Sequence, residues 1–328
     1  MRRDLDISFV MAARNAAPWI EVAIASALGQ EDVVVEVVVV DDGSTDGTGE
    51  IVAELARRDE RVRLIRGDGR GASAARNLAL DAARGAWIGV LDADDLIEPA
   101  RTSALIRLAE TAGCRLVADA CLRFLDEDPS VTWISLPEAT AGGEPFRVEL
   151  EAYLGRNRLT GGEANLGFLK PIVRRDFLTE HRIRYDERLR IGEDFDLVLR
   201  CLLAGSGFVV LPRPLYRYRV LARSLSRRLT RQDLATMLAA YDELRPTFPP
   251  APGIAAADRR LRRSMTDLDA YLGLRSAVRA HDIGASLGTA LRPGLWRAVA
   301  SLSLSSISRR AGPRRRPDQA PAKLARAG

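Results

Sequence analysis

Two adjacent carboxylates, Asp41 and Asp42, directly follow an apolar run at 33–40 that is almost entirely valine. In an open α/β sheet, ligands bind beyond the carboxyl ends of the strands. Carboxylates in that position can accept hydrogen bonds from the N–H of a nucleobase or from ribose hydroxyls. The next residues, Ser44 and Thr45, are good helix-capping residues, so a helix start near them explains part of this segment. It does not explain two acids at the end of an apolar run, and we favour a ligand-binding role for them.

A second acidic group, with Asp92 and Asp94, follows the apolar run 87–91 in the sequence Leu-Asp-Ala-Asp-Asp. Clustered carboxylates repel each other unless a cation neutralises them. Hard oxygen ligands suit Mg²⁺ or Mn²⁺, which commonly share their coordination shell with substrate phosphates. An isolated Asp-x-Asp is a weak motif, but two acidic strand ends in one strand–helix series are more specific. We therefore expect a divalent cation at this edge of the sheet.

A third acidic segment, Glu193, Asp194 and Asp196 after Gly192, stands where a loop enters a predicted helix. Acids in a first helical turn interact favourably with the helix dipole, which explains part of the pattern. Three acids with apolar residues between them are more than a helix start requires. One of these carboxylates could serve as a general base if it faces the same cleft as the other two groups.

The elements that must position these acids alternate along the first part of the chain. The predicted strands are 7–12, 33–40, 62–65 and 87–91. Of the three helices between them, the first starts at Pro18, the second starts near Ser44 or Thr45, and the third spans 72–83. This alternation predicts right-handed βαβ units and a mainly parallel central sheet flanked by helices. Further strands are expected at 168–173 and 208–211 and a helix at 193–203. The pattern is helical from Arg231 onward, with a proline-rich hinge at 246–252.

The composition, 328 residues with 47% hydrophobic and 28% charged, is that of an ordinary globular protein and excludes a collagen-like or wholly disordered chain. Three cysteines without a Cys-x-x-Cys pair argue against a disulfide framework or a zinc ribbon and favour a reducing, cytosolic setting. Two histidines leave catalysis to carboxylates and arginines. No apolar run is long enough to cross a membrane, and residues 1–3 are not followed by a secretory signal.

The formal net charge of +5 comes from the last twenty residues, 309–328, which hold seven basic residues and one acid. This tail lacks the apolar content to fold and has no aromatic residue, so it cannot stack on nucleic-acid bases, and no nucleic-acid partner is expected. Seven arginines without an acid lie between Arg213 and Arg231. They could clamp phosphate, contact an anionic membrane or form a solvated face. The loose apolar stripe at 295–307 is either packing for a terminal helix or an interfacial anchor.

Taken together, the motifs resemble those of a family 2 glycosyltransferase with the GT-A fold. The resemblance runs over residues 5–227 and extends to bacterial exopolysaccharide glucosyltransferases of succinoglycan-type assembly. It is carried by Met-Ala-Ala-Arg-Asn at 11–15, Ser-Ala-Leu-Gly-Gln at 26–30, Asp-Asp-Gly-Ser-Thr-Asp at 41–46, Gly-Ala-Ser-Ala-Ala-Arg-Asn at 71–77, Leu-Asp-Ala-Asp-Asp at 91–95, Lys-Pro at 170–171, Tyr-Asp at 185–186, Gly-Glu-Asp at 192–194 and Tyr-Arg at 218–219.

The resemblance implies a role for each matching position. Asp42 would bind the uracil of the donor, the Ala12 backbone would lie near the base, and Asp92 would lie by the ribose. The expected nucleotide-sugar site comprises Ala12, Asn15, Asp41, Asp42, Arg76 and Asp92. Asp94 would join a Mg²⁺ or Mn²⁺ ion to the diphosphate. Asp194 would deprotonate the acceptor hydroxyl, with Glu193 supporting it. One base on the opposite face of C1 implies inversion, without a covalent nucleophile.

Two positions depart from the family pattern. Arg14 stands where an aromatic residue is common, and Leu221 stands where a histidine often completes the metal shell. The metal ligands beyond Asp94 are therefore open. The Gln-x-x-Arg-Trp signature of processive synthases is absent, which favours addition of a single sugar.

These observations predict a GT-A glycosyltransferase domain at 1–228, a helical C-terminal extension at 229–308 and a disordered basic tail at 309–328. The expected reaction transfers a hexose, glucose from UDP-glucose, to a lipid-linked saccharide during exopolysaccharide or other cell-surface glycan synthesis. The enzyme would be cytoplasmic or peripheral on the inner face of the membrane. The alternatives are a sugar-phosphate nucleotidyltransferase, which would need a glycine-rich phosphate loop after the first strand, and a non-catalytic assembly subunit, which would not need Asp94 and Asp194.

Overall fold

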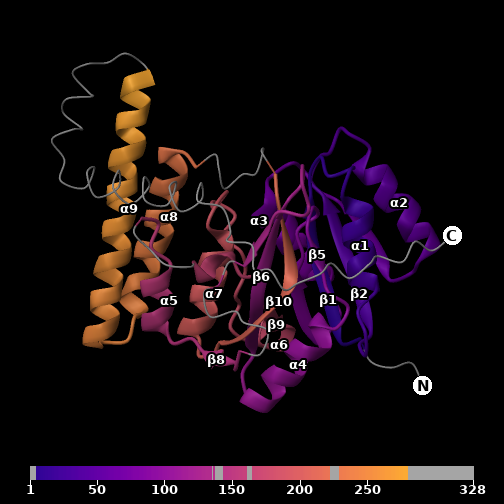
Figure 1. The fold of residues 1–328 in the computed structure, drawn as a ribbon, viewed down its shortest axis with the longest axis horizontal. Coiled ribbons are helices and arrows are strands. Elements are labelled where there is room, and N and C mark those ends of the chain that lie inside the picture. Colours follow the sequence, from indigo (N-terminus) through magenta and orange to yellow (C-terminus); the bar gives the residue numbers. More distant parts are fainter. Residues whose placement is uncertain (1–4, 135, 137–142, 161–164, 222–228, 280–328) are drawn as a thin grey trace.

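A computed structural model describes residues 5–134, 136, 143–160, 165–221 and 229–279. Within these residues, ten strands form one sheet in the order β3-β2-β1-β4-β9-β6-β10-β5, with β7 paired to β6 and β8 paired to β10 (Figure 1). The strands are β1 (Ile7–Ala13), β2 (Val35–Asp41), β3 (Val62–Arg66), β4 (Trp87–Val90), β5 (Leu96–Ile97), β6 (Leu116–Leu125), β7 (Thr132–Ile134), β8 (Phe146–Arg147), β9 (Ile172–Arg174) and β10 (Val209–Val220).

The N-terminal half of the sheet is parallel, as the sequence predicts. Strands β3, β2, β1 and β4 pair in parallel, and helices α1 (Ile20–Leu28), α2 (Thr48–Arg58) and α3 (Ala72–Ala82) connect them. Every residue of β2 is buried, which is why this strand is nearly pure valine. Parallel pairing brings the C-terminal ends of these strands to one edge, where the acidic segments begin.

The start of α2 differs from the prediction. The helix begins at Thr48, with Gly47 in a left-handed conformation (φ 90°) before it, and not near Ser44 or Thr45. The Ser44 N–H donates to Asp41, and the Asp46 carboxylate accepts from the Thr48 N–H. The acidic segment therefore forms a turn of its own before the helix begins.

The C-terminal half of the sheet is mixed. Strand β9 is antiparallel to both β4 and β6, while β10 runs parallel to β6 and antiparallel to β5. The strand expected at 168–173 is wrong in its first part, because a 3₁₀ helix, η1 (Leu166–Phe168), precedes β9. The predicted strand at 208–211 is the beginning of the longer β10. Helix α4 (Arg101–Ala112) packs on β6 and β10.

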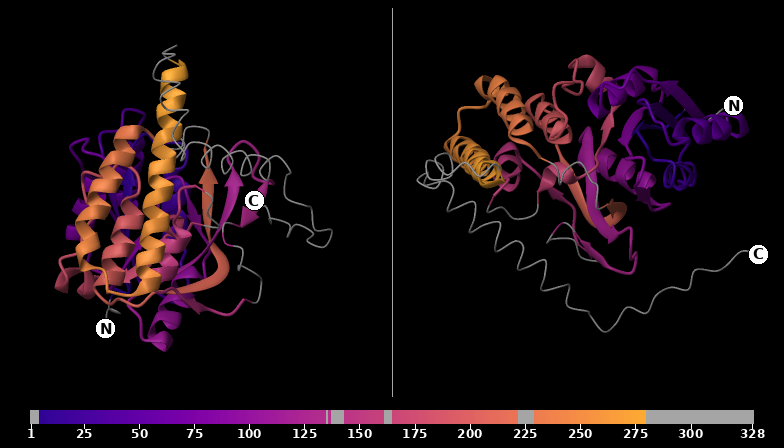
Figure 2. Two further views of the ribbon diagram at one scale, coloured as in Figure 1. Left: turned by 90° about the vertical axis from the view of Figure 1, so that its left-hand side faces the viewer. Right: turned by 90° about the horizontal axis from the view of Figure 1, so that it is seen from above.

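Four of the remaining helices gather at one end of the molecule (Figures 1 and 2): α5 (Leu150–Arg156), α7 (Glu193–Leu203), α8 (Arg231–Leu244) and α9 (Pro252–Arg279), with the 3₁₀ helix η3 (Arg245–Thr247) between the last two. Helix α6 (Arg175–Glu180) lies apart from them and packs on β9. Helices α8 and α9 pack against each other, α9 packs on α5, and α8 packs on α7. Leu234 and Leu261 belong to the same hydrophobic core as the sheet, so the described part of the C-terminal helical region is continuous with the α/β body.

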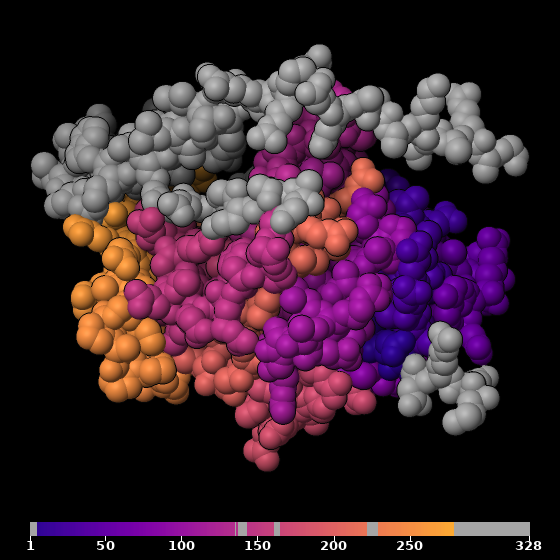
Figure 3. Space-filling view, turned by 60° about the horizontal axis from the view of Figure 1, so that its bottom comes forward, coloured from indigo at the N-terminus to yellow at the C-terminus, as the bar shows by residue number. Residues whose placement is uncertain are grey.

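A surface view shows this end-to-end arrangement, with the first strands and helices at one end and α9 at the other (Figure 3). Helix α7 matches its predicted bounds, and the helical pattern from Arg231 is confirmed as far as Arg279. The prediction for 280–308, the apolar stripe at 295–307 and the basic tail lie outside the described residues. None of the described helices is both long and apolar enough to span a bilayer.

Candidate active site

One buried arginine joins the second and third acidic segments. Arg76 lies on α3, its side chain is only 5% exposed, and it donates to Asp92 and Glu193 at 2.7 Å each. The same guanidinium lies 3.6 Å from Asp194. The partners are up to 117 residues apart in the sequence. The fold therefore brings together four of the predicted site residues, Arg76, Asp92, Glu193 and Asp194.

A buried lysine joins the same two segments a second time. Lys170 Nζ lies 2.6 Å from Asp194 Oδ2 and 2.8 Å from Asp92 Oδ2. Burial disfavours the charged amine, but the attraction of Asp194 and then of Asp92 outweighs it and holds the pKa of Lys170 well above its usual value. The Tyr185 hydroxyl donates to Asp194 Oδ1 at 3.3 Å. Asp194 is thus oriented from both of its oxygens.

The cluster of Arg76, Lys170, Asp92, Glu193 and Asp194 holds two positive and three negative groups, and we call it the charge cluster. Burial raises the pKa of Asp92, but Lys170 and Arg76 outweigh it and lower that pKa, so this carboxylate stays ionised. Burial, and then the charge of Asp194, raises the pKa of Glu193. A proton therefore binds Glu193 more readily than an isolated glutamate.

The loop after β4 is fixed by β10. The Tyr216 hydroxyl donates to Asp95 at 2.8 Å, and the Arg219 N–H donates to the other Asp95 oxygen at 2.7 Å. The Arg219 side chain donates to the Asp94 carbonyl at 2.7 Å and pairs with Asp126 at 2.8 Å. These contacts set the direction in which the Asp94 carboxylate leaves the loop.

Asp94 is the carboxylate in this loop with the chemistry of a metal ligand. Among the described residues, no other residue donates a hydrogen bond to its carboxylate. Burial, with the negative charge of Asp92, raises the pKa of Asp94 to about 6. A divalent cation would relieve both effects, so the donor chemistry fits Mg²⁺ or Mn²⁺. In the part of the chain that the structure describes, no three His, Cys, Asp or Glu side chains form a ready metal cage, so phosphate or water oxygens would complete the shell.

The residues predicted to bind the nucleotide lie at the adjacent ends of β1 and β2, where Ala12 pairs with Val40 and Ala13 with Asp41. Asp42 accepts from the N–H groups of Arg70 and Gly71, at 3.1 and 2.8 Å. It therefore shapes the turn that begins α3.

Asp41 and Asn15 are also held by neighbouring chain segments. Asp41 pairs with Arg66 and accepts from Ser44. Asn15, in a left-handed conformation (φ 53°), accepts from the Thr45 N–H at 2.9 Å. These residues form the wall on the side of the sheet edge away from the charge cluster.

Sequence reasoning assigned no place in the site to five residues that build it: Lys170, Tyr185, Asp95, Tyr216 and Arg219. All of them except Tyr216 stand in the motifs that carry the family resemblance. Lys170 carried a signal, because it is one of only two lysines in a chain with 49 basic residues. Because nearly all other basic residues are arginine and the second lysine lies in the basic tail, a lysine at position 170 suggests a specific role there. The sequence pattern around Arg219 was misleading. Arg219 is one of seven arginines between 213 and 231, which suggested a basic surface, whereas its side chain is largely buried.

The arginine-rich segment after 213 is not a uniform basic face. Arg217 and Arg219 both lie over the Phe124 ring, at 5.5 and 4.7 Å from its centroid, and Arg231 pairs with Asp269. The arginines at 223, 227 and 228 lie outside the described residues.

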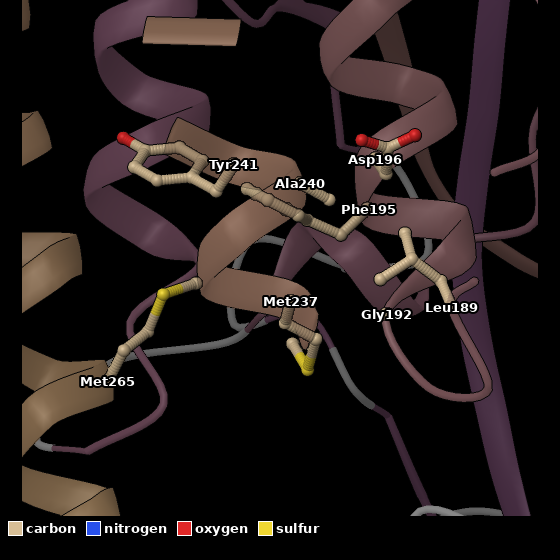
Figure 4. A pocket seen from close by; sticks show the side chains of 8 residues that line it. All are labelled: Leu189, Gly192, Phe195, Asp196, Met237, Ala240, Tyr241 and Met265. Atoms are coloured by element: carbon tan, nitrogen blue, oxygen red, sulfur yellow. The ribbon is translucent and has the colours of Figure 1, made fainter. Parts of the chain in front are cut away.

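A small cavity lies behind the N-terminus of α7, between α7, α8 and α9 (Figure 4). Phe195 extends from α7 toward α8, where its ring lies 6.2 Å from that of Tyr241. The cavity, at about 10 Å³, is no larger than one water molecule. It is a packing void between these helices and is too small to hold a substrate.

A family model described as "Glycosyl transferase family 2" matches residues 8–178. The succinoglycan biosynthesis protein ExoO of Rhizobium meliloti (strain 1021) is 38% identical over 288 residues, which cover 87% of this chain and 81% of that protein. ExoU of the same organism is 36% identical over 226 residues, covering 67% and 64%. The chain therefore belongs to glycosyltransferase family 2.

Solved structures agree on the fold. Staphylococcus aureus TarS 1–349, in complex with UDP-GlcNAc, superposes with a TM-score of 0.61 at 17% identity, over 87% of this chain and 90% of that one. The mannosyltransferase PcManGT from Pyrobaculum calidifontis, in complex with GDP-Man and Mn²⁺, superposes with a TM-score of 0.57 at 20% identity, over 94% and 84%. The chain has the GT-A fold and is a glycosyltransferase.

Proposed function

We propose that this glycosyltransferase moves a hexose, glucose from UDP-glucose, to a saccharide acceptor with inversion at the anomeric carbon. One observation carries the proposal: Lys170 contacts both Asp194 and Asp92. A single side chain therefore connects the candidate base to the loop after β4, which carries the candidate metal ligand Asp94. An inverting transfer needs this pairing of a base with an anion-binding centre, because the acceptor is deprotonated as the nucleotide leaves.

In the proposed reaction, an acceptor hydroxyl oxygen attacks C1 of the donor sugar and its proton passes to Asp194. The bond from C1 to the diphosphate oxygen breaks, and UDP leaves with the electron pair. Arg76 and Lys170 hold the Asp194 carboxylate in place, and Glu193 shares the Arg76 guanidinium. A divalent ion bound at Asp94 would supply electrostatic stabilisation of the leaving diphosphate.

The donor assignment rests on the wall formed by Ala12, Asn15, Asp41 and Asp42. It is supported by the structurally similar TarS, which is in complex with UDP-GlcNAc. The names of ExoO and ExoU support a place in exopolysaccharide biosynthesis. We further propose a lipid-linked acceptor and a peripheral position on the inner membrane face.

For the chain as a whole, we propose the division expected from the sequence: a catalytic domain at 1–228, a helical extension at 229–308 and a basic tail at 309–328. The described helices α8 and α9 belong to the extension.

The test measures UDP release from a panel of UDP-sugars with Mn²⁺ or Mg²⁺, and the anomeric configuration of the product by NMR. Asp194→Asn keeps the shape of the side chain but cannot take the proton, so we expect a loss of transfer of at least a thousandfold with UDP binding retained. Asp196→Asn is the matched control, because Asp196 is buried on the same helix and pairs with Arg200 outside the charge cluster. Sustained transfer by Asp194→Asn would refute the base, and a retained configuration would refute the mechanism.

A further inference from the structure

The Arg123 guanidinium lies close to two aromatic rings and, within the described part of the chain, has no ionic partner. The Arg123 guanidinium lies 5.3 Å from the centroid of the Phe168 ring and 5.0 Å from that of Tyr218. Among the described residues it makes no ion pair, and its buried Nε has no hydrogen-bond partner. Buried polar groups are nearly always paired, so this arginine needs a functional explanation.

The three side chains lie on the site face of the sheet. Tyr218 is two residues from Tyr216 on β10, and alternate residues of a strand share a face, so Tyr218 points to the side where the Tyr216 hydroxyl meets Asp95. Arg123 is the register partner of Tyr218 on β6. Phe168 precedes Lys170 by two residues, and Lys170 contacts the base Asp194.

The Phe168 ring is both exposed and firmly mounted. It is 39% exposed, although it is a large apolar side chain. Its backbone belongs to η1, where the Gly167 N–H is held by Asn157 and Asn165 at 2.6 and 2.8 Å. Since η1 packs on α7, the ring is fixed relative to the N-terminus of the helix that carries Asp194. A rigid exposed aromatic ring offers contact area with little loss of conformational entropy.

The chemistry of this stack suits a sugar ring. A pyranose presents C–H groups on one face, and the negative face of an aromatic ring attracts such positive edges. Both aromatic rings lie close to the Arg123 guanidinium, whose N–H groups can donate to sugar oxygens. In the strand order, β6 and β10, which carry Arg123 and Tyr218, lie on the other side of β4 and β9 from β1 and β2, whose ends carry Ala12, Asn15, Asp41 and Asp42.

We propose that Phe168 and Arg123 form the binding subsite for the acceptor saccharide, with the sugar ring packed on Phe168 and its oxygens accepting from Arg123. The Tyr218 ring packs against the same guanidinium. This inference rests on the proposed function and adds the residues that recognise the acceptor.

Saturation-transfer NMR with methyl β-D-glucopyranoside, galactopyranoside and mannopyranoside, in the presence of UDP and the diamagnetic ion Mg²⁺, tests the subsite. We expect saturation of the protons on one ring face in the wild type, and a weakening of affinity of roughly tenfold in Phe168→Ala and in Arg123→Met. Phe168→Tyr keeps the ring and should keep the signal. Val22→Ala on α1, which also truncates an exposed apolar side chain (50% exposed), is the matched control.

Calorimetric titration of UDP with Mn²⁺ into the wild type and each variant distinguishes failure of the proposed donor from failure of the proposed acceptor subsite. Failure of UDP to bind the wild type would refute the proposed donor while leaving the glycoside measurement to judge the subsite. Normal UDP binding with an unchanged glycoside signal in Phe168→Ala and Arg123→Met would overturn the subsite. Absence of a glycoside signal in the wild type would overturn it as well.

Discussion

Lys170 donates a hydrogen bond of 2.6 Å to Asp194, and both side chains are almost completely buried. A lysine and an aspartate taken out of water lose much solvation, which their mutual attraction offsets only with good geometry and further partners. Here Asp92 accepts from the same amine, and Arg76 approaches from α3. The pair is therefore one contact of the charge cluster, which joins the loop after β4 to the first turn of α7.

Replacement of Lys170 by methionine should strongly destabilise the chain, because it leaves Asp92 and Asp194 buried with less neutralising charge. We expect a loss of about 3–5 kcal/mol in the free energy of unfolding, measured by denaturant titration. Arg58→Met is the control, because its pair with Glu54 is exposed and should be worth less than about 1 kcal/mol. Equal effects of the two changes would contradict a buried, coupled cluster.

Asp94→Asn should change stability in a pH-dependent way. The pKa of Asp94 is raised to about 6, so the folded chain holds this proton more tightly than the unfolded chain, and the wild type loses stability as the pH rises from about 4 to 6. Asparagine carries no charge and avoids this loss.

Without added metal, we expect Asp94→Asn to be more stable than the wild type at pH 7.5 by roughly 1–3 kcal/mol, with the difference shrinking by pH 4. Mn²⁺ should raise the melting temperature of the wild type at pH 7.5 and leave that of Asp94→Asn unchanged. A similar Mn²⁺ response in both proteins would show that Asp94 is not a ligand.

Tyr216→Phe tests whether the Tyr216 hydroxyl holds the loop after β4, which carries the proposed metal ligand Asp94, in place. The Tyr216 hydroxyl donates to Asp95 and accepts from the Asp92 N–H at 3.2 Å, so its removal leaves buried polar groups unpaired at a cost of about 1–3 kcal/mol. Loss of such a supporting contact typically weakens metal affinity by about 10–100-fold. Titration of Mn²⁺ in the presence of UDP measures the effect, and Tyr271→Phe on α9 is the control. Unchanged Mn²⁺ affinity would mean that the loop keeps its shape without Tyr216.

Thr230→Ala tests whether helix α8 contributes to stability without contributing to catalysis. Thr230 caps α8 in a reciprocal arrangement with Asp233, in which each side chain accepts from the backbone of the other. Loss of this cap should lower the free energy of unfolding by about 1 kcal/mol. The rate of UDP release at saturating substrate should stay within about twofold, because α8 meets α7 at Gly192 and Phe195, and no hydrogen bond or ion pair of the described residues joins α8 to the charge cluster. A large loss of turnover with unchanged stability would show that α8 acts directly on the site.

Much of the fold was predictable from the sequence because local patterns carry it. The valine run of β2 and the helical period of α7 are set by which faces are buried, and both elements lie where they were expected. The start of α2 and the η1 turn were not predictable, because side-chain contacts of Asp41, Asp46 and Asn165 decide them. Such contacts compete with the helix or strand pattern at element ends.

The sequence by itself determined which acidic residues were available for a site and that several of them directly follow predicted strands. Asp42, Asp92 and Asp94 stood out because acids at the ends of apolar runs are costly unless something binds them, and Asp194 stood out as one of three acids where a loop enters a helix. Only the tertiary structure decided which of them act together. Arg76 and Lys170 meet Asp92 and Asp194 because α3, the end of β4, the loop before β9 and α7 converge at one edge of the sheet. Electrostatic attraction in a buried site depends on distances of a few ångströms, and residues separated by more than a hundred positions acquire such distances only when the chain folds.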